Sequence, residues 1–298
     1  MQLAEPRKVV LITGTGHCGS TLLDMMLGGH PSAFGLGELK VLYDDSNYRL
    51  GTTPPSVVYR YDDPLWTPDR MQAIHELFAR ETTWWQRAVL KYRPQLLTGR
   101  ADIYRTILAA TRDRTVLIDS SKNTRYCRIA LAQLAAATDL QPFLIWIWRD
   151  PRAVINSYRR KFPATSVDEW IARVQHMQTQ KQRLFDGAAA PKRRVSYEAL
   201  CRNPQAELRP LCALLDLPFR EDMVAYWQHE QRQLAGNSGT KTLVARYHER
   251  MGSFSHKPWS AAHYKTHPLA IKLDERWRTE LPVADQRRIA SAFGLSTE

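Results

Sequence analysis

The sequence predicts an α/β fold, a three-layer sandwich in which helices cover both faces of a central parallel sheet. Short apolar runs rich in β-branched residues alternate with helical segments along the chain. A glycine-rich turn joins the first run to the first helix, as in P-loop-like nucleotide-binding folds. Strands that alternate with helices imply right-handed crossovers and therefore a parallel sheet. Because an α/β domain can occupy this length alone, the 298 residues are predicted to form a single domain, residues 1–298.

The predicted strands are short and apolar. Val9–Thr13 is a continuous apolar and β-branched run that ends at Gly14, which is typical of a strand buried on both faces. Similar runs predict three later strands, at Thr115–Asp119, Phe143–Trp148 and Arg194–Ser196. Each is followed by polar residues and then by a helical segment, so the carboxyl ends of the strands are expected to meet at one edge of the sheet.

The predicted helices follow from capping signals and composition. The first, Ser20–Leu27, is followed by Gly28 and Gly29, which suit a helix end. The segment 128–137 is rich in Ala and Leu, both good helix formers. Pro151 suits the first turn of a helix that continues to Lys161. Further helical segments are predicted at Asp69–Lys91, Tyr197–Cys201, Leu200–Leu217 and Asp274–Phe293.

The charge of the chain favours anionic partners. Lys and Arg total 42 against 30 Asp and Glu, for a net charge of +12. Nucleic acid, an anionic membrane surface or a phosphorylated small molecule would all fit this charge, and so would a merely solvated basic surface. The sequence has no RNP-like, zinc-finger or helix-turn-helix pattern, so nucleic acid is not expected as a partner.

Hydropathy and cysteine content predict a cytoplasmic protein. No window approaches the roughly 18 apolar residues that span a bilayer, so no integral membrane segment is expected. The run Val9–Ile12 is too short for the core of a signal peptide. The four cysteines have no close metal-ligand spacing and are expected to be free thiols.

The stretch 13–23 predicts an anion site between the first strand and the first helix. Glycines let backbone N–H groups converge on one point, and a helix N-terminus adds partial positive charge there. Gly14, Gly19 and Thr21 match the nucleotide-binding pattern G-x-x-x-x-G-K-[ST], but Ser20 stands at the lysine position. That lysine reaches the β- and γ-phosphates of a nucleoside triphosphate, so its replacement argues against a kinase or NTPase. The alternative is a glycine-rich turn without a ligand.

A second anion site is predicted after the strand 143–148. Arg149 stands at the carboxyl end of this strand, where open α/β sheets bind ligands. Its planar, permanently charged group suits phosphate. Ser157 lies about two helical turns further on and can offer its hydroxyl to the same ligand. Asp150 and Pro151 also read as the cap and first turn of the following helix, but that interpretation leaves Arg149 unexplained, since a cation is disfavoured at a helix N-terminus.

The segment GHCGSTLLDMMLGGHP, residues 16–31, resembles the 5′-phosphosulfate-binding loop of sulfotransferases that use 3′-phosphoadenosine 5′-phosphosulfate (PAPS). The loop of that family usually reads [K/R]-S-G-[S/T]-T-L and is followed by H-P, here His30-Pro31. The resemblance implies that the donor is bound by Gly16, His17, Cys18, Gly19, Ser20 and Thr21. In the family, the basic residue that opens the loop neutralises the leaving oxygen. His17 replaces it here, and can do so only when protonated or as a neutral N–H donor.

Two later segments extend the resemblance. Arg149 and Ser157 have the spacing of the Arg and Ser that hold the 3′-phosphate in the family, and Lys161 would add charge one turn further on. The segment from Val195 to Pro204 resembles the family's Y-E-x-L…x-P segment, which implies that Tyr197 lies beside the nucleotide; a tyrosine packed in the core is the alternative. Residues 236–241 and 273–278 also resemble family patterns, without implied roles.

The resemblance implies two further catalytic residues besides His17. Glu38, in the G-E position used by the branch that sulfates carbohydrates or protein tyrosines, would be the general base. Gly35 and Gly37 precede it and suit a tight chain reversal toward the site. Lys122, just past the second predicted strand, would stabilise the transferred sulfuryl group. No metal is expected, since the transferred group is less charged than a γ-phosphate.

The expected reaction is in-line transfer of a sulfuryl group from PAPS to an acceptor hydroxyl, which leaves 3′-phosphoadenosine 5′-phosphate (PAP). The acceptor is left open among a small molecule, a glycan, a lipid and a peptide. The helical insertion at 41–114 is a candidate acceptor-binding cap, although Trp66, Trp84 and Trp85 are each expected in the core. The alternatives are a P-loop kinase of small molecules and a nucleotide- or anion-binding module without catalysis.

Overall fold

The computed structural model describes residues 5–44, 65–80, 83–111, 113–249 and 267–296. These residues contain a five-stranded sheet in the order β2-β3-β1-β4-β5, with all neighbouring strands parallel. The strands are β1 (Arg7–Thr13), β2 (Ala33–Gly37), β3 (Val116–Lys122), β4 (Leu140–Trp148) and β5 (Lys192–Ser196). The predicted α/β class, with a central parallel sheet, is therefore confirmed.

The central strand β1 has a partner on each side along its whole length. Lys8 pairs with Val116 of β3 and with Gln141 of β4, and Thr13 pairs with Lys122 and Trp146. This register brings the carboxyl ends of the three strands to the same edge of the sheet. The segments that follow them, including the glycine-rich loop after β1, therefore start side by side.

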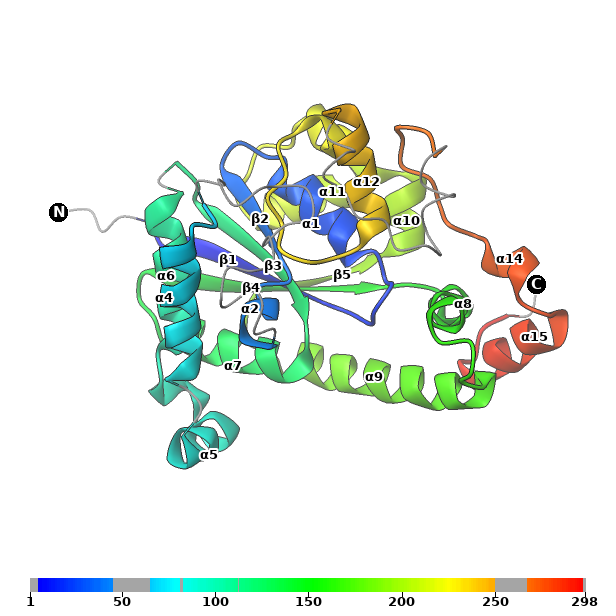
Figure 1. Ribbon diagram of the computed structural model, residues 1–298, viewed down its shortest axis with the longest axis horizontal. Coiled ribbons are helices and arrows are strands. Elements are labelled where there is room, and N and C mark those ends of the chain that lie inside the picture. Colours follow the sequence, from blue (N-terminus) through cyan, green and yellow to red (C-terminus); the bar gives the residue numbers. More distant parts are fainter. Residues whose placement is uncertain (1–4, 45–64, 81–82, 112, 250–266, 297–298) are drawn as a thin grey trace.

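Both faces of the sheet are covered, as the continuous apolar strands require. Val10 and Ile12 of β1 point into one core with α1 (Ser20–Gly28), whereas Val9 and Leu11 point into another. The first core also contains α10 (Tyr197–Arg202) and α11 (Pro204–Leu214). Figure 1 shows these three helices on one side of the sheet, with α7 (Thr124–Ala135) and α9 (Val167–Gly187) on the other.

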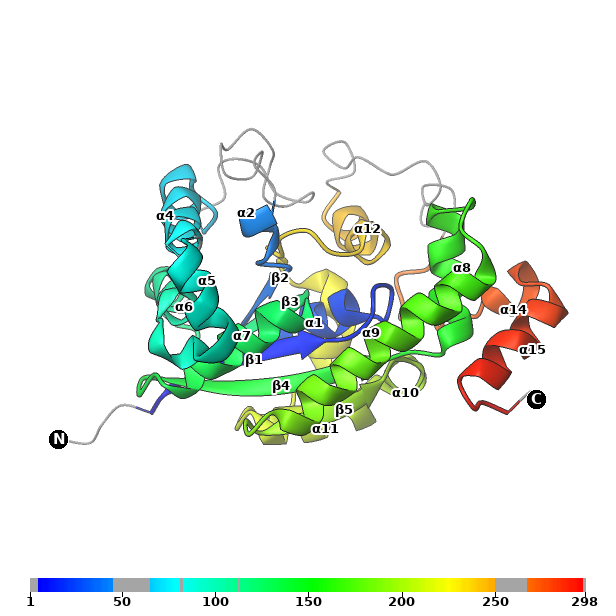
Figure 2. The ribbon, with the colours of Figure 1, turned by 90° about the horizontal axis from the view of Figure 1, so that it is seen from below.

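A third apolar cluster lies beyond the end of the sheet. It packs α8 (Pro151–Lys161) against α9, and both against the C-terminal helices α14 (Trp277–Glu280) and α15 (Val283–Ala292). Figure 2 shows α9 running under the sheet toward this group. The start of α8 is fixed locally, because Asp150 accepts a hydrogen bond from the Arg152 backbone N–H and Pro151 occupies the first turn. Arg149 thus stands at the junction of β4 and α8.

The remaining elements extend the two main cores. Elements α4 and α6 pack on one another beside α7 at the far end of the sheet, and α12 packs on η2. The bounds are α2 (Val41–Asp44), α4 (Pro68–Ala79), α5 (Trp84–Tyr92), η1 (Pro94–Leu96), α6 (Gly99–Ala110), η2 (Glu221–Gln228) and α12 (Ser238–Tyr247). None of the helices in the described ranges is both long and apolar enough to cross a bilayer.

The structure differs from the sequence predictions in several elements. Strand β2 was not predicted, and neither was α9, although Ser166 and Glu169 form a capping box at its start. The single helical segment predicted at 69–91 is two helices, α4 and α5, and the one at 274–293 is α14 and α15. Residues 45–64 of the insertion predicted at 41–114 lie outside the described residues.

The three tryptophans of the insertion do not share one environment. Trp66 is fully buried and its indole N–H donates to the Arg232 carbonyl at 2.7 Å, as expected of a core residue. The prediction of a core position is wrong for Trp84, which is 83% exposed, and for Trp85, which is 47% exposed. Both lie on α5, a short helix of which only Leu90 is buried, and Figure 1 shows this helix projecting from the body of the protein.

The four cysteines are free and buried, as predicted for thiols outside a disulfide framework. Cys18, Cys201 and Cys212 lie in the core that contains α1, and Cys127 lies in the core on the other face of the sheet. Burial raises the pKa of all four thiols. They are therefore protonated at neutral pH and shielded from reagents in solution.

Candidate active site

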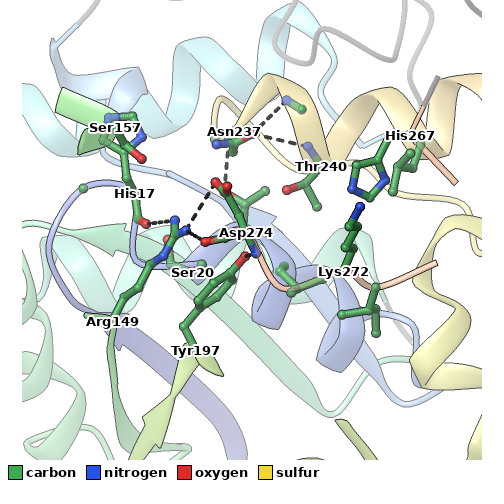
Figure 3. A pocket seen from close by; sticks show the side chains of 18 of the residues that line it. His17, Ser20, Arg149, Ser157, Tyr197, Asn237, Thr240, His267, Lys272 and Asp274 are labelled. Carbon is green, nitrogen blue, oxygen red and sulfur yellow. Dashed lines mark hydrogen bonds and ion pairs between the residues drawn. The ribbon is translucent and has the colours of Figure 1, made fainter. Parts of the chain in front are cut away.

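A cavity of about 470 Å³ lies at the carboxyl edge of the sheet, between the loop after β1 and the start of α8. This volume is typical of a site for a small molecule. The two segments predicted to bind anions both line it, together with part of the C-terminal region (Figure 3). The basic side chains around it are Lys122, Arg149, Arg160, Lys161, Lys272 and Arg276, and the acidic ones are Glu38 and Asp274.

The glycines of the loop are required by close packing. Gly19 has φ 94°, and a Cβ atom there would lie 2.3 Å from Cδ2 of Tyr197. At Gly16, a Cβ atom would lie 2.2 Å from the hydroxyl of Tyr158. Both distances are far inside van der Waals contact. The loop therefore packs directly against the rings of Tyr158 and Tyr197, and both glycines line the cavity.

His17 lies in the left-handed region with φ 62°, which is rare for a residue with a side chain. Its ring meets the ring of Tyr158 edge-on, with centroids 4.8 Å apart. Burial lowers the pKa of His17 to about 4, and the nearby charges of Lys161, Arg149, Arg160 and Lys122 act in the same direction. At neutral pH the imidazole of the unliganded protein is uncharged. Of the two roles that the sequence left open for His17, this favours the neutral N–H donor.

The other loop residues differ in what they present to the cavity. Ser20 and Thr21 line it at the start of α1. The Thr21 hydroxyl already accepts the backbone N–H of Asn237 at 3.0 Å, which ties the loop to the C-terminal region. Cys18 is fully buried in the core beneath the loop, so only its backbone can face a ligand.

Arg149 lies at the centre of the cavity wall and is only 6% exposed. It donates to the His17 carbonyl at 3.0 Å and to the Asp274 carbonyl at 2.7 Å, and it stacks 4.3 Å above the ring of Tyr197 (Figure 3). Its Nε–H has no hydrogen-bond partner in the described structure. A buried donor without a partner is costly, so the position suits an anionic ligand.

Ser157 lies two turns along α8 and also lines the cavity. Its hydroxyl donates to the Ala153 carbonyl at 2.9 Å and accepts from Arg160 at 3.3 Å. Lys161 lines the cavity at the end of the same helix. Ser157, Arg160 and Lys161 form one polar face of α8 that lines the cavity.

Asp274 is a cavity residue that the sequence did not identify. Its carboxylate pairs with Arg149 at 3.2 Å and with Arg276 at 2.7 Å, and its backbone N–H donates to the Tyr197 hydroxyl at 3.4 Å. Burial alone would raise the pKa of Asp274, but the hydrogen bond from Arg276 and the charges of both arginines outweigh it and lower the pKa. In the unliganded protein this carboxylate partly neutralises the arginine proposed for the phosphate.

The C-terminal region closes the side of the cavity opposite α8. Asn237 caps α12 by accepting from the backbone N–H groups of Gly239 and Thr240. Figure 3 shows His267 and Lys272 on the side of Thr240 away from Asn237. Gly236 has φ 88° and packs against Thr21 of the loop. The G-N pair at 236–237 was noted in the sequence without a role. Its part in the site follows from contacts across more than 200 residues of chain.

Glu38 and Lys122 meet at the end of the cavity nearest strands β2 and β3. The Lys122 ammonium lies 2.5 Å from the Glu38 carboxylate, and both side chains are partly exposed. Burial opposes the charged form of Lys122, but the charge of Glu38, the hydrogen bond to Glu38 and the other acidic groups nearby together outweigh burial and raise the pKa of Lys122. Lys122 is therefore an ammonium group at neutral pH. It has φ 60°, so two of the predicted catalytic residues, His17 and Lys122, occupy a rarely populated backbone conformation.

The position of Glu38 is fixed by the strand before it, and not by the chain reversal that its glycines suggested. Gly35 and Gly37 belong to β2, where Cβ atoms would lie 2.3 Å from Asp24 and 2.1 Å from the Leu234 carbonyl. Gly37 bridges to Leu234, and the Glu38 backbone N–H donates to the Leu234 carbonyl at 2.9 Å. The fully buried Asp24 accepts the Gly37 N–H at 3.1 Å, and burial raises the pKa of Asp24 to about 7.

The end of β3 that carries Lys122 also contains Asp119, which is buried in the sheet. The Asp119 carboxylate accepts from the hydroxyls of Tyr104 at 2.7 Å and Tyr126 at 2.9 Å, and from the Ser121 backbone N–H at 2.8 Å. Ser121 in turn accepts the Lys40 backbone N–H at 3.0 Å, so the segments that carry Lys122 and Glu38 are joined. Within the described ranges, no group of three or more His, Cys, Asp or Glu side chains is placed to hold a metal ion.

Comparison with known proteins identifies the family. A model of the sulfotransferase family matches residues 10–221. Among solved structures, a sulfotransferase domain from the curacin biosynthetic pathway is 18% identical, with a TM-score of 0.55 over 98% of this chain and 99% of that one. A sulfotransferase domain from the Synechococcus PCC 7002 olefin synthase is 21% identical, with a TM-score of 0.52 over 99% and 98%. These likenesses show a shared fold.

A search of curated proteins found no match. The family match covers more than two thirds of the chain and contains both predicted anion-binding segments together with Glu38 and Lys122. The chain therefore belongs to the sulfotransferase family.

Proposed function

We propose that the protein transfers a sulfuryl group from PAPS to an acceptor hydroxyl. The observation that carries the proposal is that the loop 14–21 and the pair Arg149 and Ser157 line one cavity. These segments lie at the ends of neighbouring strands, β1 and β4, and both suit anions. PAPS has anionic groups at its two ends, the 5′-phosphosulfate and the 3′-phosphate. One nucleotide placed across the cavity would engage both segments.

The residues present fit the donor. The glycine-rich loop and the first turn of α1, with Ser20 and Thr21, would hold the 5′-phosphosulfate through backbone N–H groups. Arg149 would hold the 3′-phosphate, using the Nε–H that has no partner in the described structure, with Ser157 and Lys161 beside it. Tyr197 supports the arginine from below by cation–π stacking. The adenine would lie between these two ends.

Lys122 would stabilise the sulfuryl group as it is transferred, and His17 would stabilise the departing phosphate. In sulfuryl transfer the acceptor oxygen forms a bond to sulfur while the bond from sulfur to the bridging oxygen breaks, and negative charge develops on the 5′-phosphate of PAP. Lys122 offers a permanent positive charge to the sulfuryl group and His17 offers a neutral N–H to this phosphate. Fixed groups aimed at developing charge are the main source of catalysis in such transfers.

Glu38 would take the proton of the acceptor hydroxyl. Its carboxylate stands at the cavity end farthest along the sheet from Arg149, next to Lys122, and its backbone is fixed on both sides by β2 and Leu234. A general base contributes on the order of 10²–10⁴-fold. The proton would move from the acceptor oxygen to the Glu38 carboxylate as the sulfur–oxygen bond forms.

Nucleotide binding separates this proposal from a small-molecule kinase. A ligand that binds the folded state raises the unfolding temperature according to its concentration and affinity. We expect PAP to stabilise the protein more than ADP or AMP at equal concentration, and radiolabelled PAPS to transfer its label to an acceptor in a metabolite extract. Stronger stabilisation by ADP than by PAP would contradict the proposal. Stabilisation by PAP without any transfer would instead favour the non-catalytic module.

A further inference from the structure

A second cavity, of about 480 Å³, lies on the other side of Glu38 and Lys122 from the donor cavity. Gly16, Glu38 and Lys122 line both cavities, so the two meet at the proposed reacting centre. The remaining lining residues come from the loop after β1, the start of α2, the start of α7 and one face of α9; they are Gly14, Lys40, Val41, Ser121, Asn123, Thr124, Arg125, Met177, Gln180 and Lys181.

The position of this cavity suits the acceptor. In an in-line transfer the acceptor oxygen must approach sulfur from the side opposite the leaving phosphate. With the donor in the first cavity, a hydroxyl reaching Glu38 from the second cavity would have this approach. Asn123, Arg125 and Gln180 are exposed, so the cavity opens at the protein surface. Of the insertion 41–114, Val41 contributes to its wall.

The cavity wall is basic. Lys40, Arg125 and Lys181 line it in addition to Lys122. Among the lining residues that the structure describes, Glu38 is the one carboxylate, and Lys122 already pairs with it. The N-terminus of α7 adds partial positive charge, and no acidic residue in its first turn offsets that charge. An uncharged acceptor would gain nothing from this arrangement.

Lys181 is the most informative of these residues. Its side chain is 6% exposed, and its ammonium group donates to the Lys122 carbonyl and, at 2.8 Å, to the Thr124 hydroxyl. In the described ranges neither Lys181 nor Arg125 forms an ion pair with a carboxylate. A buried ammonium group without a counter-ion is unfavourable, and burial accordingly lowers the pKa of Lys181. An anion bound in the cavity would supply the missing charge.

We propose that the second cavity binds an acceptor that carries an anionic group besides its hydroxyl, with the anionic group on the side of Lys181 and Arg125 and the hydroxyl at Glu38. This inference rests on the proposed sulfuryl transfer, since Glu38 defines where the hydroxyl must be. A carboxylate and a phosphate monoester share the required chemistry. The size of the cavity suits a small molecule or the end of a larger one.

A thiol placed in the cavity tests its electrostatic potential without knowledge of the acceptor. Met177→Cys puts a thiol on the wall, and the four native cysteines are buried. We would measure its rate of modification by an anionic and a cationic methanethiosulfonate reagent, each divided by the rate with free mercaptoethanol. Thr179→Cys, exposed on the same helix and outside the cavity, is the reference for the overall positive charge of the protein.

The proposal predicts that the anionic-to-cationic ratio in Met177→Cys exceeds the ratio in Thr179→Cys. Adding Arg125→Gln to Met177→Cys should lower the ratio about fivefold, the size of one partly exposed charge interaction. Adding Arg183→Gln, which removes an exposed arginine of α9 outside the cavity, should leave it unchanged. Equal ratios for the two introduced thiols would overturn the proposal.

Turnover gives a second test with the intact enzyme. Hydroxyphenylacetate and hydroxyphenylpropionate would be compared with their methyl esters, and a hydroxylated phosphate monoester with its neutral triester, by kcat/KM with PAPS as donor. Higher values for the acids, reduced by Arg125→Gln but not by Arg183→Gln, support the proposal; equal or higher values for the neutral forms contradict it. Stabilisation by PAP is measured in parallel. If PAP does not stabilise the protein, the donor assignment itself is refuted. If PAP stabilises it but acids are not preferred as acceptors, only the acceptor inference is refuted.

Discussion

The carboxylate of Glu38 and the ammonium group of Lys122 lie 2.5 Å apart, at the ends of adjacent strands β2 and β3. This ion pair separates the two cavities of the site, since both residues line each of them. The Glu38 backbone is fixed by Leu234, the residues before Lys122 are fixed by the buried Asp119, and the two segments are joined by the hydrogen bond from Lys40 to Ser121. The pair is thus a rigid element at the place where the proposed donor and acceptor meet.

Replacing Glu38 by glutamine should remove the base while keeping the size of the side chain. We expect Glu38→Gln to retain its affinity for PAP and to lose on the order of 10²–10⁴-fold in kcat. Calorimetric titration with PAP and turnover of labelled PAPS measure the two effects. Glu76→Gln, on the exposed face of α4, serves as the matched control and should behave as wild type. Near-normal turnover of Glu38→Gln would end the assignment.

Lys122 combines a charge with an unusual backbone conformation, and two variants separate these features. Lys122→Ala and Lys122→Gly both remove the ammonium group, so both should lose most turnover. At φ 60°, alanine carries a steric cost of about 1 kcal/mol that glycine does not have. Chemical denaturation should therefore show the glycine variant to be the more stable of the two. The reverse order would mean that the left-handed conformation relaxes in the variants.

If Arg149 binds the nucleotide as proposed, Asp274 should compete with the nucleotide for it. Since its carboxylate lies 3.2 Å from the arginine, we expect Asp274→Asn to bind PAP about threefold or more tightly, and Arg149→Gln to bind it more than about tenfold less tightly. Calorimetric titration with PAP measures both changes. Asp285→Asn is the control, because Asp285 pairs with Arg159 of α8, and neither residue lines the cavity. Weaker PAP binding by Asp274→Asn would show that the carboxylate orients Arg149 for the ligand instead of competing with it.

His17 should make the stability of the unliganded protein depend on pH. With a pKa of about 4 in the folded state and about 6.5 in the unfolded state, the unfolded chain binds more protons between these values. The stability contributed by the neutral imidazole is complete above pH 6.5 and is lost as the pH falls toward 4. The loss is about 2 to 3 kcal/mol by pH 4.5.

The test of this pH dependence compares urea denaturation of the wild type and His17→Asn at pH 7 and pH 4.5. Asparagine tolerates the left-handed conformation of position 17, so the variant isolates the titration. The difference in free energy of unfolding between the wild type and the variant should shift by about 2 to 3 kcal/mol in favour of the variant between pH 7 and pH 4.5. His176→Asn, exposed on α9, is the control and should show no such shift. An equal response of both variants would contradict the buried, neutral state of His17.

The parts of the fold that the sequence predicted are those whose signal is local. Strands β1, β3 and β4 are continuous apolar runs, and the start of α8 is specified by Asp150 and Pro151, so each was recognised close to its true position. Strand β2 was missed because two of its five residues are glycines, which weaken any strand pattern. Those glycines are explained only by tertiary contacts with Asp24 and Leu234.

The candidate site likewise contains residues that a local sequence pattern predicts and residues that only tertiary contacts explain. The loop after β1 and the segment from Arg149 to Ser157 carry recognisable patterns, and the parallel order of β1 and β4 brings them together. The segments that contain Asp274 and Asn237 resemble family patterns but gave no roles, because each residue acquires its place through a partner far away in the chain, Arg149 and Thr21 respectively. The capping box of Ser166 and Glu169 was a readable signal for α9, the helix that carries Lys181.

The match to the family ends at residue 221, yet the first cavity is also lined by residues beyond that point, among them Gly236, Asn237, Lys272 and Asp274. A chain trimmed to the matched portion would keep both predicted anion-binding segments, but the first cavity would be open along one side. Proteins that agree over the motif-bearing portion can therefore differ in how firmly they grip the same nucleotide. Grouping them by motif alone would therefore overlook differences in the part of the chain that follows the motifs.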